Sequence, residues 1–388
     1  MRNAPNRIAD FFDTYTRDLK AEDLQRLFTR DTREAYQFFT RGHDQDAFKL
    51  LPWYWRTWAY IKTFFVAFTM RLSPARRVVY AVALFFAASG LLNLVRGVRL
   101  GRALVGPVTV VLPGLGFPEG TVSLIFAFAL MNLLVLLEVA DRLSLKNDLE
   151  IARQIQQAML PSGQFAAPGV ETAGTSRPAN TVGGDFYDIL PLDDGRLAVA
   201  LGDVAGKGSP AALLMALSLA MLRTLVDEQL EPAELMTRLN VQVCRQAPRT
   251  RFITLFYAVF DPRTGGLIYV SAGHTPPLLL RRLGSCERLT DGGIALGMFD
   301  HSTYTAGHAT LEIDDLVGIY SDGITEAENP AGTPFDESGL EGALKSSRML
   351  ATSAIPAAIL RSVEQYTADT RLADDLTILV LRRRPLAN

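Results

Sequence analysis

The stretch LAVALGDVAGKG, from Leu197 to Gly208, joins an apolar run to a glycine-rich turn through a single acidic residue, Asp203. A short apolar run that ends in turn residues is typical of a buried strand. A carboxylate at the end of such a strand is costly to bury unless a partner, a proton or a cation compensates its charge. The stretch therefore predicts a strand edge that carries a charge in need of a partner.

Similar strand-like runs surround this stretch, with helical segments between them. They are FITLFYAVF, GLIYVSAG, LVGIYSDG and LTILVLRR. We expect a helix with Ser209 as its N-cap and Pro210 in its first turn, because both residue types favour those positions. The turn residues from Asp261 to Gly266 predict a β-hairpin. This mixture predicts one α+β domain over residues 166–385.

Three more acidic sites lie at strand edges of this domain. Asp185 follows a glycine pair, Asp322 ends the run LVGIYSD, and Asp374 and Asp375 precede LTILVL. Taken singly, an aspartate beside glycine is most often turn chemistry. If the strand ends gather all four sites, their repulsion requires cations, and oxygen donors without His or Cys favour Mg²⁺ or Mn²⁺ over Zn²⁺. Two such ions would form a hydrolytic site that needs no protein nucleophile.

Other catalytic motifs fit the sequence less well. Only three residues separate Gly202 from Gly206, so the run GDVAGKGS does not have the spacing of a phosphate-binding P-loop. There is no GxSxG motif, and we expect Ser321 to be a turn residue. His274 either approaches a phosphate or is structural, and the four histidines show no metal-ligand spacing.

The composition narrows the functional class. The chain has 388 residues, 48% of them hydrophobic, and a net charge of -2. Without a basic excess, nucleic-acid binding is disfavoured. The two cysteines, Cys244 and Cys286, form no CxxC or Cys/His pattern, so neither a disulfide framework nor a zinc site is indicated.

The high hydrophobic content comes partly from two long apolar runs near the N-terminus. Residues 78–95 and 120–137 each lack a charged side chain over 18 residues, which predicts two membrane spans within a region of residues 76–140. A pair of buried core helices is the alternative. Residues 103–118 are apolar but broken by Pro and Gly, which leaves a third crossing, a re-entrant piece and a loop open. We expect residues 1–75 to form amphipathic and interfacial helix.

A linker helix is expected over residues 141–161, ending at Pro161. Its apolar residues recur at the average spacing of a coiled-coil seam; they are Leu145, Leu149, Ala152, Ile155 and Met159. Barely two heptads are present, so an ordinary amphipathic helix packed on the next domain is an equal alternative.

Five motifs in this order resemble one known family. They are VGGDFYD, GDVAGKGSPAALLM, SAGHTPPLLL, YSDGITEA and ADDLTILVLR, and the helix ending IQQAMLP precedes them. The set is similar to the SpoIIE/RsbU family of bacterial serine/threonine phosphatases, a branch of the metal-dependent 2C-type phosphatases, over residues 145–384. The resemblance implies two antiparallel β-sheets packed face to face, flanked by helices, with two Mn²⁺ or Mg²⁺ ions at one end.

The resemblance also implies roles for individual residues. Asp203 would bridge both ions, Asp322 and Asp374 would hold the first, and the Val204 carbonyl with Asp185 would serve the second. Asp375 would bind metal or support a ligand. Asp185 and Asp203 would then be the catalytic residues of the site.

The substrate contacts implied by the resemblance are less definite. Gly206, Lys207 and His274 are the expected contacts of the phosphorylated substrate. Whether Arg177, Lys207 or neither grips the phosphate stays open.

The implied activity is hydrolysis of phosphoserine or phosphothreonine by a metal-activated water. The implied partner is a phosphorylated anti-sigma-factor antagonist, with a kinase or a receiver domain as another possible substrate and a catalytically silent binding module as the alternative function. With the apolar runs, this predicts a multi-pass protein of the bacterial inner membrane, in contact with lipid, with a cytoplasmic phosphatase domain and a homodimer through the linker helix.

Overall fold

The computed structural model describes residues 72–96, 100–105, 108–113, 120–248, 250–368 and 372–386, with a few positions between 52 and 70. The chain divides into two compact units, residues 1–143 and residues 144–388. Each is described by itself. Most of the amphipathic region expected over residues 1–75 lies outside the described residues.

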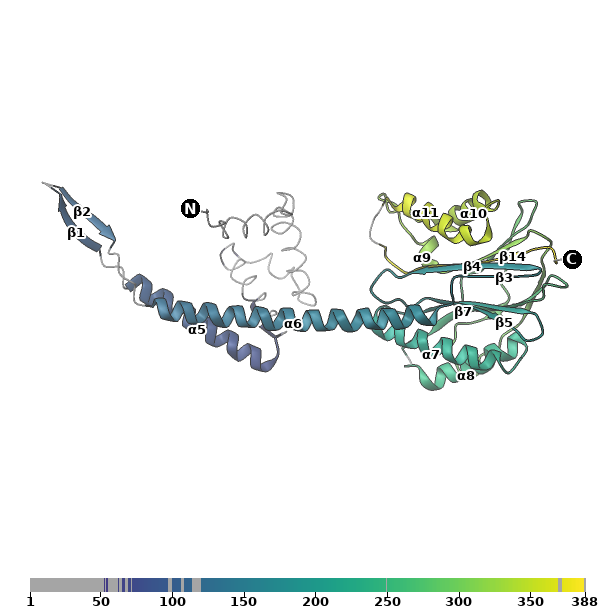
Figure 1. Ribbon diagram of the computed structural model, residues 1–388. Helices are drawn as coiled ribbons and strands as arrows, with labels where there is room; N and C mark the ends of the chain where they lie inside the picture. Colours follow the sequence, from purple (N-terminus) through teal and green to yellow (C-terminus); the bar gives the residue numbers. More distant parts are fainter. Residues whose placement is uncertain are drawn as a thin grey trace, which may run out of the picture. The chain divides into compact units, whose positions relative to one another are not determined.

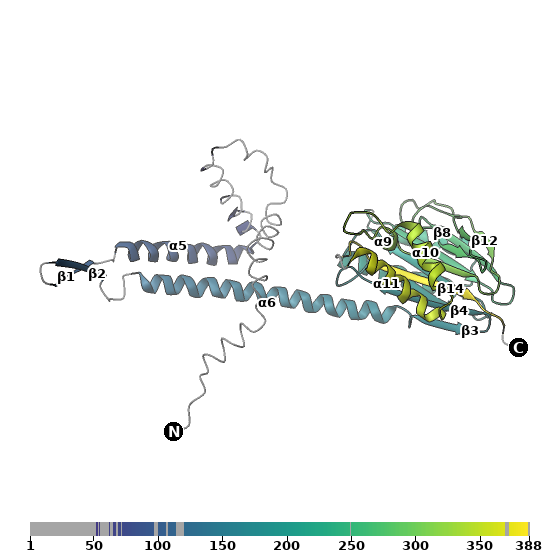
Figure 2. The same cartoon turned by 90° about the horizontal axis from the view of Figure 1, so that it is seen from above.

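The first unit contains a helix, a two-stranded sheet and the start of a second helix. Helix α5 spans Pro74–Arg96 and α6 spans Thr121–Met159, and strands β1 (Leu100–Val105) and β2 (Val108–Pro113) pair antiparallel between them. Residues 103–105 and 108–113 of the expected apolar segment thus lie in paired strands. Within this unit α5 runs alongside the first part of α6 (Figures 1 and 2). Arg76 pairs with Asp141 at 2.7 Å and with Glu138 at 3.3 Å.

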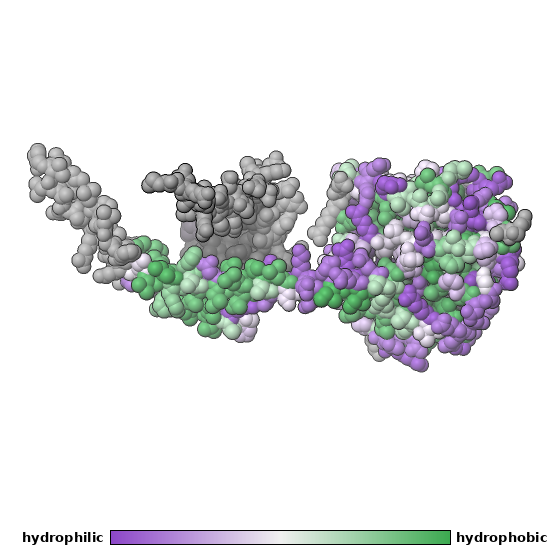
Figure 3. Space-filling view, viewed as in Figure 1, coloured by the Kyte–Doolittle hydropathy of each residue, from purple (hydrophilic) through white to green (hydrophobic). Residues whose placement is uncertain are grey.

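Three described helices are long and apolar enough to cross a membrane: residues 74–94, 121–159 and 209–226. The first two have windows of mean hydropathy 1.7 and 2.4 that are hardly buried by protein, and apolar side chains gather over them in Figure 3. The third, α7 (Ser209–Val226), packs Leu214, Met215 and Leu219 into the core of the second unit. This burial identifies α7 as a core helix of the second unit.

Helix α6 continues without a break from the apolar run into the expected linker. It ends at Met159, two residues before Pro161, because proline cannot continue the backbone hydrogen-bonding pattern. Of the expected seam residues, Leu145 and Ile155 are 62% and 60% exposed. Among the described residues, none buries these two apolar side chains.

The second unit is a sandwich of two sheets with helices on both outer sides (Figure 1). One sheet has the order β11-β8-β7-β6-β5, with β12 also on β8, and the other has the order β10-β9-β13-β14-β4-β3. Helices α7 and α8 cover the first sheet, and α9, α10 and α11 lie over the second (Figure 1).

The strands of the first sheet are β5 (Phe186–Pro191), β6 (Leu197–Val204), β7 (Ile253–Phe260), β8 (Gly266–Ala272), β11 (Gly292–Gly293) and β12 (Gly307–Thr310). Those of the second are β3 (Gln164–Ala167), β4 (Val170–Arg177), β9 (Leu278–Leu280), β10 (Cys286–Arg288), β13 (Leu316–Tyr320) and β14 (Leu376–Arg383). The remaining helices are α8 (Pro232–Gln246), α9 (Asp322–Thr325), α10 (Asp336–Ser347), the 3-10 turn η3 (Thr352–Ala354) and α11 (Ile355–Thr367).

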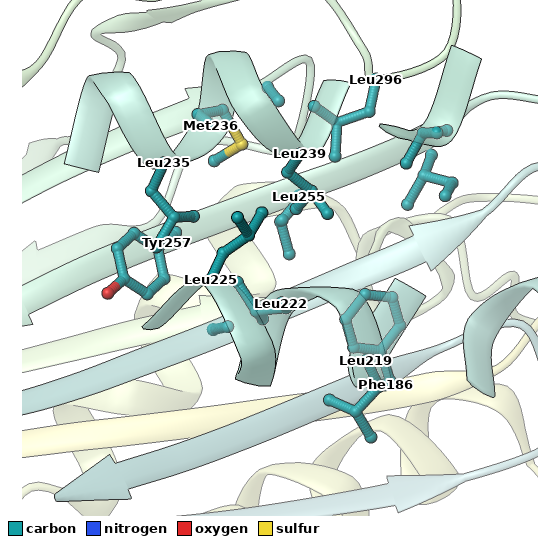
Figure 4. Close-up of a cluster of buried hydrophobic side chains, with 14 of the residues drawn as sticks. Phe186, Leu219, Leu222, Leu225, Leu235, Met236, Leu239, Leu255, Tyr257 and Leu296 are labelled. Atoms are coloured by element: carbon teal, nitrogen blue, oxygen red, sulfur yellow. The ribbon is translucent and has the colours of Figure 1, made fainter. Parts of the chain in front are cut away.

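Burial on both faces explains why the central strands read as continuous apolar runs. Successive side chains of a strand point to opposite faces of its sheet. In β6, Ala198 and Ala200 pack towards α7, while Val199 and Leu201 pack between the sheets. Figure 4 shows the cluster on the helical side, including Phe186, Leu219, Leu222 and Tyr257. The expected hairpin is present as β7 and β8 in antiparallel register.

The start of α7 differs by one residue from the sequence-based expectation. Gly208, at φ 77°, occupies the N-cap and Ser209 is the first helical residue, without a side-chain capping bond. Pro210 lies in the first turn as expected. The chain leaves the glycine-rich turn through a positive φ that glycine tolerates better than serine.

A buried ion pair joins three elements of the second unit. Asp188 of β5 is 1% exposed and accepts hydrogen bonds from Arg223 of α7, at 2.7 Å from Nε and 3.2 Å from Nη2. The same Nη2 donates to the carbonyl of Met159 at the end of α6, at 2.7 Å. This interaction accounts for Asp188, the second acid of the motif VGGDFYD, and fixes the end of α6 on the sandwich.

Substituting Arg223 should lower the free energy of unfolding more than substituting Asp188. Arg223→Met leaves a buried carboxylate without its cation and should lower the free energy of unfolding of residues 144–388 by about 3 kcal/mol. Asp188→Asn leaves a partly exposed arginine and should cost about 1 to 2 kcal/mol. Urea denaturation measures both. Arg238→Met, which breaks exposed pairs with Glu228 and Glu234, is the matched control and should cost under about 1 kcal/mol. Equal losses for the two arginine variants would contradict this account.

Candidate metal centre

The four acidic sites come from both sheets. Asp203 lies near the end of β6, and Asp185 precedes β5, whose Phe186 pairs with Gly202. Asp322 begins α9 directly after β13, and Asp374 precedes β14. Because β13 and β14 are antiparallel neighbours with Tyr320 opposite Ile378, the last two sites lie at one edge of the second sheet.

Glycines allow these segments to approach one another. A Cβ atom on Gly184 would lie 2.9 Å from the Val204 carbonyl oxygen and 3.3 Å from Oδ1 of Asp203. A Cβ on Gly323 would lie 2.1 Å from the Asp375 carbonyl oxygen, which no side chain could occupy. The loops that carry Asp185 and Asp322 therefore need glycine where they meet their neighbours.

Burial and mutual repulsion raise the pKa values of the gathered carboxyl groups. Asp185 is 5% exposed, and its pKa is well above the usual value because of burial and, next, the charges of Asp203 and Asp375. Burial and the charge of Asp322 raise the pKa of Asp203 to about 6. Burial and the charge of Asp374 also raise the pKa of Asp322. The sites are thus close enough to destabilise one another's charged forms.

The donor set suits hard divalent cations. Oδ2 of Asp185 is buried and has no hydrogen-bond partner among the described residues, so one polar atom of the cluster is left for an external group. Carboxylate and carbonyl oxygens are the ligands that Mg²⁺ and Mn²⁺ prefer. Within the described part of the chain, no three His, Cys, Asp or Glu side chains are already at metal-binding spacing. The match to Mg²⁺ or Mn²⁺ therefore rests on two observations: the unpaired Oδ2 of Asp185, and a set of ligand atoms that are all oxygens.

Asp375 holds the loop that carries Asp185. Its Oδ1 accepts from the Ala179 amide at 2.8 Å, and its Oδ2 accepts from the Gly184 amide at 2.7 Å. Both oxygens are thus committed to backbone groups. Of the two roles expected for Asp375, support of a neighbouring ligand fits these contacts better than direct metal binding.

Ser321 has a structural role beside the site. It is fully buried, its Oγ donates to the Asp375 carbonyl at 3.2 Å, and it accepts from the Thr377 amide at 3.0 Å. This is the turn role expected from the sequence.

Lys207 lies at the mouth of the site. Its Nζ is 2.8 Å from Oδ2 of Asp374, and hydrogen bonding to Asp374 raises its pKa. A cavity of about 680 Å³ opens beside this pair. Arg177, the other expected phosphate contact, forms an ion pair with Glu364. Lys207 is thus the one of the two that lines this cavity.

Arg251 is a neighbour of the site that the motifs did not reveal. Its Nη1 donates to the Ala205 carbonyl at 2.6 Å, over Gly206, which has φ 104°. A Cβ on Gly206 would overlap the guanidinium. The register of β6 and β7 could have found this residue, because Val204 pairs with Ile253 and the next positions bring Gly206 opposite Arg251.

His274 lies behind the site instead of at its surface. It is 6% exposed, and its Nδ1 shares a hydrogen bond of 3.0 Å with Oγ1 of Thr254, the residue that pairs with Asp203. Burial lowers its pKa to about 4. The sequence-based expectation that His274 contacts substrate does not fit this burial, and the structural alternative does.

Gln156 connects α6 to the site and was missed by sequence reasoning. Its buried side chain donates to the Gly183 carbonyl at 2.7 Å and accepts from the Gly183 amide at 3.1 Å. Gly183 lies beside Asp375, since a Cβ there would be 2.3 Å from Oδ2 of that residue. The loop before Asp185 is therefore held by α6 on one side and by Asp375 on the other.

The raised pKa of Asp203 predicts how the stability of the metal-free domain depends on pH. A carboxyl group whose pKa is raised on folding binds more protons in the folded state, so its contribution to stability is lost as pH rises through about 6. Asp203→Asn removes this titration. We compare the free energies of unfolding of residues 144–388 with and without this substitution, in EDTA. The difference in favour of the variant should grow by about 2 to 3 kcal/mol from pH 4 to pH 7. Thermal or urea unfolding across this range measures the difference, and parallel pH profiles would contradict it.

Comparisons with known proteins bear on the family and the fold of the second unit. Residues 193–384 match the family model described as Stage II sporulation protein E (SpoIIE). Protein IcfG of Synechocystis is 29% identical over 67% of this chain and 45% of its own length. Phosphoserine phosphatase RsbU of Bacillus subtilis is 29% identical over 62% of this chain and 71% of its own length. The chain thus spans less than half of one relative and about seven tenths of the other.

A solved structure shows the same fold as the second unit. The SiaA-PP2C domain of Pseudomonas aeruginosa aligns with a TM-score of 0.55 and 21% identity, over 63% of this chain and 98% of that domain. The expected α+β fold of two antiparallel sheets with flanking helices is therefore confirmed. The family resemblance in the five motifs is confirmed as well. Residues 193–384 thus resemble the SpoIIE family in sequence, and the second unit has the fold of the solved SiaA-PP2C domain.

Proposed function

We propose that this chain is a membrane-tethered, metal-dependent protein-serine/threonine phosphatase. The observation that carries the proposal is that Asp185 and Asp203 from one sheet lie close to Asp322 and Asp374 from the other, and that Oδ2 of Asp185 is buried without a partner among the described residues. The relative RsbU, named a phosphoserine phosphatase, supports the same chemistry.

The residues that would hold two Mn²⁺ or Mg²⁺ ions are those at the strand ends. Asp203 is suited to bridge them, Asp322 and Asp374 to hold one ion, and Asp185 with the Val204 carbonyl to hold the other. Bound ions of this kind acidify a water molecule and neutralise phosphate charge. The chain itself contributes the positions of these ligands, fixed by Asp375 and by the glycines that let the loops meet.

The surroundings favour direct hydrolysis over a phosphoenzyme. Ser321, the hydroxyl nearest in sequence to Asp322, is buried and hydrogen bonded on both sides, so it is unsuited to act as a nucleophile. Lys207 places an ammonium group at the mouth, where it can meet the charge of an arriving phosphate once Asp374 is neutralised by a cation.

We further propose that the substrate is a phosphorylated regulatory protein, with an anti-sigma-factor antagonist as the first candidate and a kinase or receiver domain as the others. The cavity of about 680 Å³ beside Lys207 and Asp374 is open at the surface, which suits a phosphorylated protein segment better than a deeply enclosed small molecule.

Helices α5 and α6 are proposed to anchor the chain as a multi-pass protein of the bacterial inner membrane, with the phosphatase domain in the cytoplasm. Their length, hydropathy and low burial support a lipid environment. The exposed Leu145 and Ile155 on the continuation of α6 support a homodimer through this helix.

Helix α6 is also proposed to control the site. Its last turns contact the domain through Gln156 at the loop before Asp185 and through the Met159 carbonyl at Arg223. A rotation or shift of α6 would move Gly183, because Gln156 is hydrogen bonded to both of its backbone groups. Asp185 follows Gly183 by two residues and would be displaced with it.

Metal-dependent hydrolysis is the test of the proposed activity. Residues 144–388 with Mn²⁺ should cleave a phosphoserine peptide, and Asp203→Ala and Asp322→Ala should each lower kcat/KM roughly a thousandfold. Asp193→Ala removes an exposed acid on the β5–β6 turn and should leave the rate unchanged. Phosphate release measures the rates. Activity that ignores metal and both site substitutions would refute the proposal, and a folded chain without any hydrolysis would favour a silent binding module.

The role of α6 has its own test. In the full-length protein, Gln156→Ala should lower kcat more than it raises KM for the phosphopeptide, because it loosens a metal-bearing loop and not the substrate cavity. Leu149→Asp with Ile155→Asp should change basal activity and reduce dimerisation, measured by light scattering. Gln154→Ala, which changes an exposed glutamine of the same helix two residues before Gln156, is the control. Unchanged activity and oligomeric state in all variants would leave α6 as an anchor only.

A further inference from the structure

A second cavity of about 480 Å³ opens at the far end of the second sheet. It lies where β4 begins, β13 begins and β14 ends, beside the turn after β9 and the loop after α10. Buried Leu280 and Leu316 contribute apolar walls, and exposed Met349 and Leu350 form part of the rim. The volume falls in the range of small-molecule sites, roughly 300 to 1,000 Å³.

This cavity is lined by five arginines and only two carboxylates. Both carboxylates, Glu171 and Asp314, are paired with Arg384 at 3.3 and 2.8 Å. Arg281 is satisfied outside the cavity by Glu287 and Asp315. Among the residues that the structure describes, the other three arginines, Arg282, Arg348 and Arg382, form no ion pair with a carboxylate.

Arg382 is the most constrained of these three. It is 7% exposed, and its two Nη atoms donate to the carbonyls of Leu350 and Arg348, at 3.0 and 2.5 Å. These bonds fix the loop after α10, so Arg382 has a structural role there. They pair the guanidinium with carbonyl oxygens and not with a carboxylate. Burial, followed by repulsion from Arg384, lowers the pKa of Arg382, and the charges of Glu171 and Asp314 offset part of this shift. Gathering further unpaired guanidinium groups beside it adds to the same electrostatic cost.

The cavity is separate from the candidate metal centre. Strand β14 begins directly after Asp374 and Asp375 and ends at Arg383, eight residues later. At about 3.3 Å per residue, its two ends lie roughly 25 Å apart. The arginines at one end therefore cannot contact a phosphate held by the carboxylates at the other.

We infer that this cavity is a binding site for a small organic anion that carries phosphate or carboxylate groups. Guanidinium groups pair with both kinds of oxyanion through two parallel hydrogen bonds, and Arg282 and Arg348 have no carboxylate partner to displace among the described residues. Arg382 supplies a fixed cation in the wall, and the leucines accept an apolar part of the ligand. A multivalent anion would relieve the repulsion that the arginines impose on one another.

Calorimetry on the full-length protein in nanodiscs of zwitterionic lipid tests the inference. Inorganic pyrophosphate provides the phosphate arm and citrate the carboxylate arm, both at constant ionic strength. Metal ions are removed from protein and buffer with a chelating resin beforehand, so that neither probe chelates or follows a metal ion at the other site and no soluble carboxylate competes with the probes. At least one probe should bind one-to-one with a Kd of about 1 mM or tighter. Arg282→Gln with Arg348→Gln should weaken that binding about tenfold or more.

The matched control removes the same charge elsewhere in the domain. Arg245 and Arg361 are exposed and form no ion pair among the described residues, so Arg245→Gln with Arg361→Gln should leave the Kd within about twofold. Unfolding midpoints without ligand verify that both double variants are folded, as expected for substitutions of side chains that hold no buried partner. The inference would be overturned if neither probe bound even with a Kd of about 10 mM. Equal weakening of binding in both double variants would also overturn it.

Discussion

The repulsion among carboxylates that two sheets bring to one edge is the constraint on which the rest of the structure depends. Burial raises the pKa values of Asp185, Asp203 and Asp322, and each charge makes the next harder to keep. A fold that holds such a cluster must fix its loops firmly against this repulsion. The backbone bonds of Asp375 fix one loop, and the glycines at the crossing points let the loops approach one another.

The same loop is held by the last turns of α6. Gly183 is held by Gln156 of α6 through both of its backbone groups, and Asp375 binds the next amide. At the end of α6, the buried pair of Asp188 and Arg223 adds a second attachment. Helix α6 thus reaches the loop before Asp185 by direct hydrogen bonds, without an intervening element.

Local patterns in the sequence were sufficient for much of the fold and for the acids of the site. The central strands are visible because each is a short apolar run closed by turn residues, and the acids stand out at the ends of those runs. Features that depend on tertiary contacts were not visible. The partners of Asp188 and Gln156 come from other elements, and the burial of His274 follows from the packing of β7 and β8. Arg251 needed the strand register, and no local motif marks it.

The central claim is that the gathered carboxylates hold two divalent cations. Electron paramagnetic resonance of the full-length protein titrated with Mn²⁺ tests it most directly, because it counts bound ions and detects magnetic coupling between neighbours. The account predicts two Mn²⁺ ions per chain with a coupled signal, and loss of that signal in Asp203→Asn. Binding of no Mn²⁺ ion, or the same signal in the variant, would contradict it.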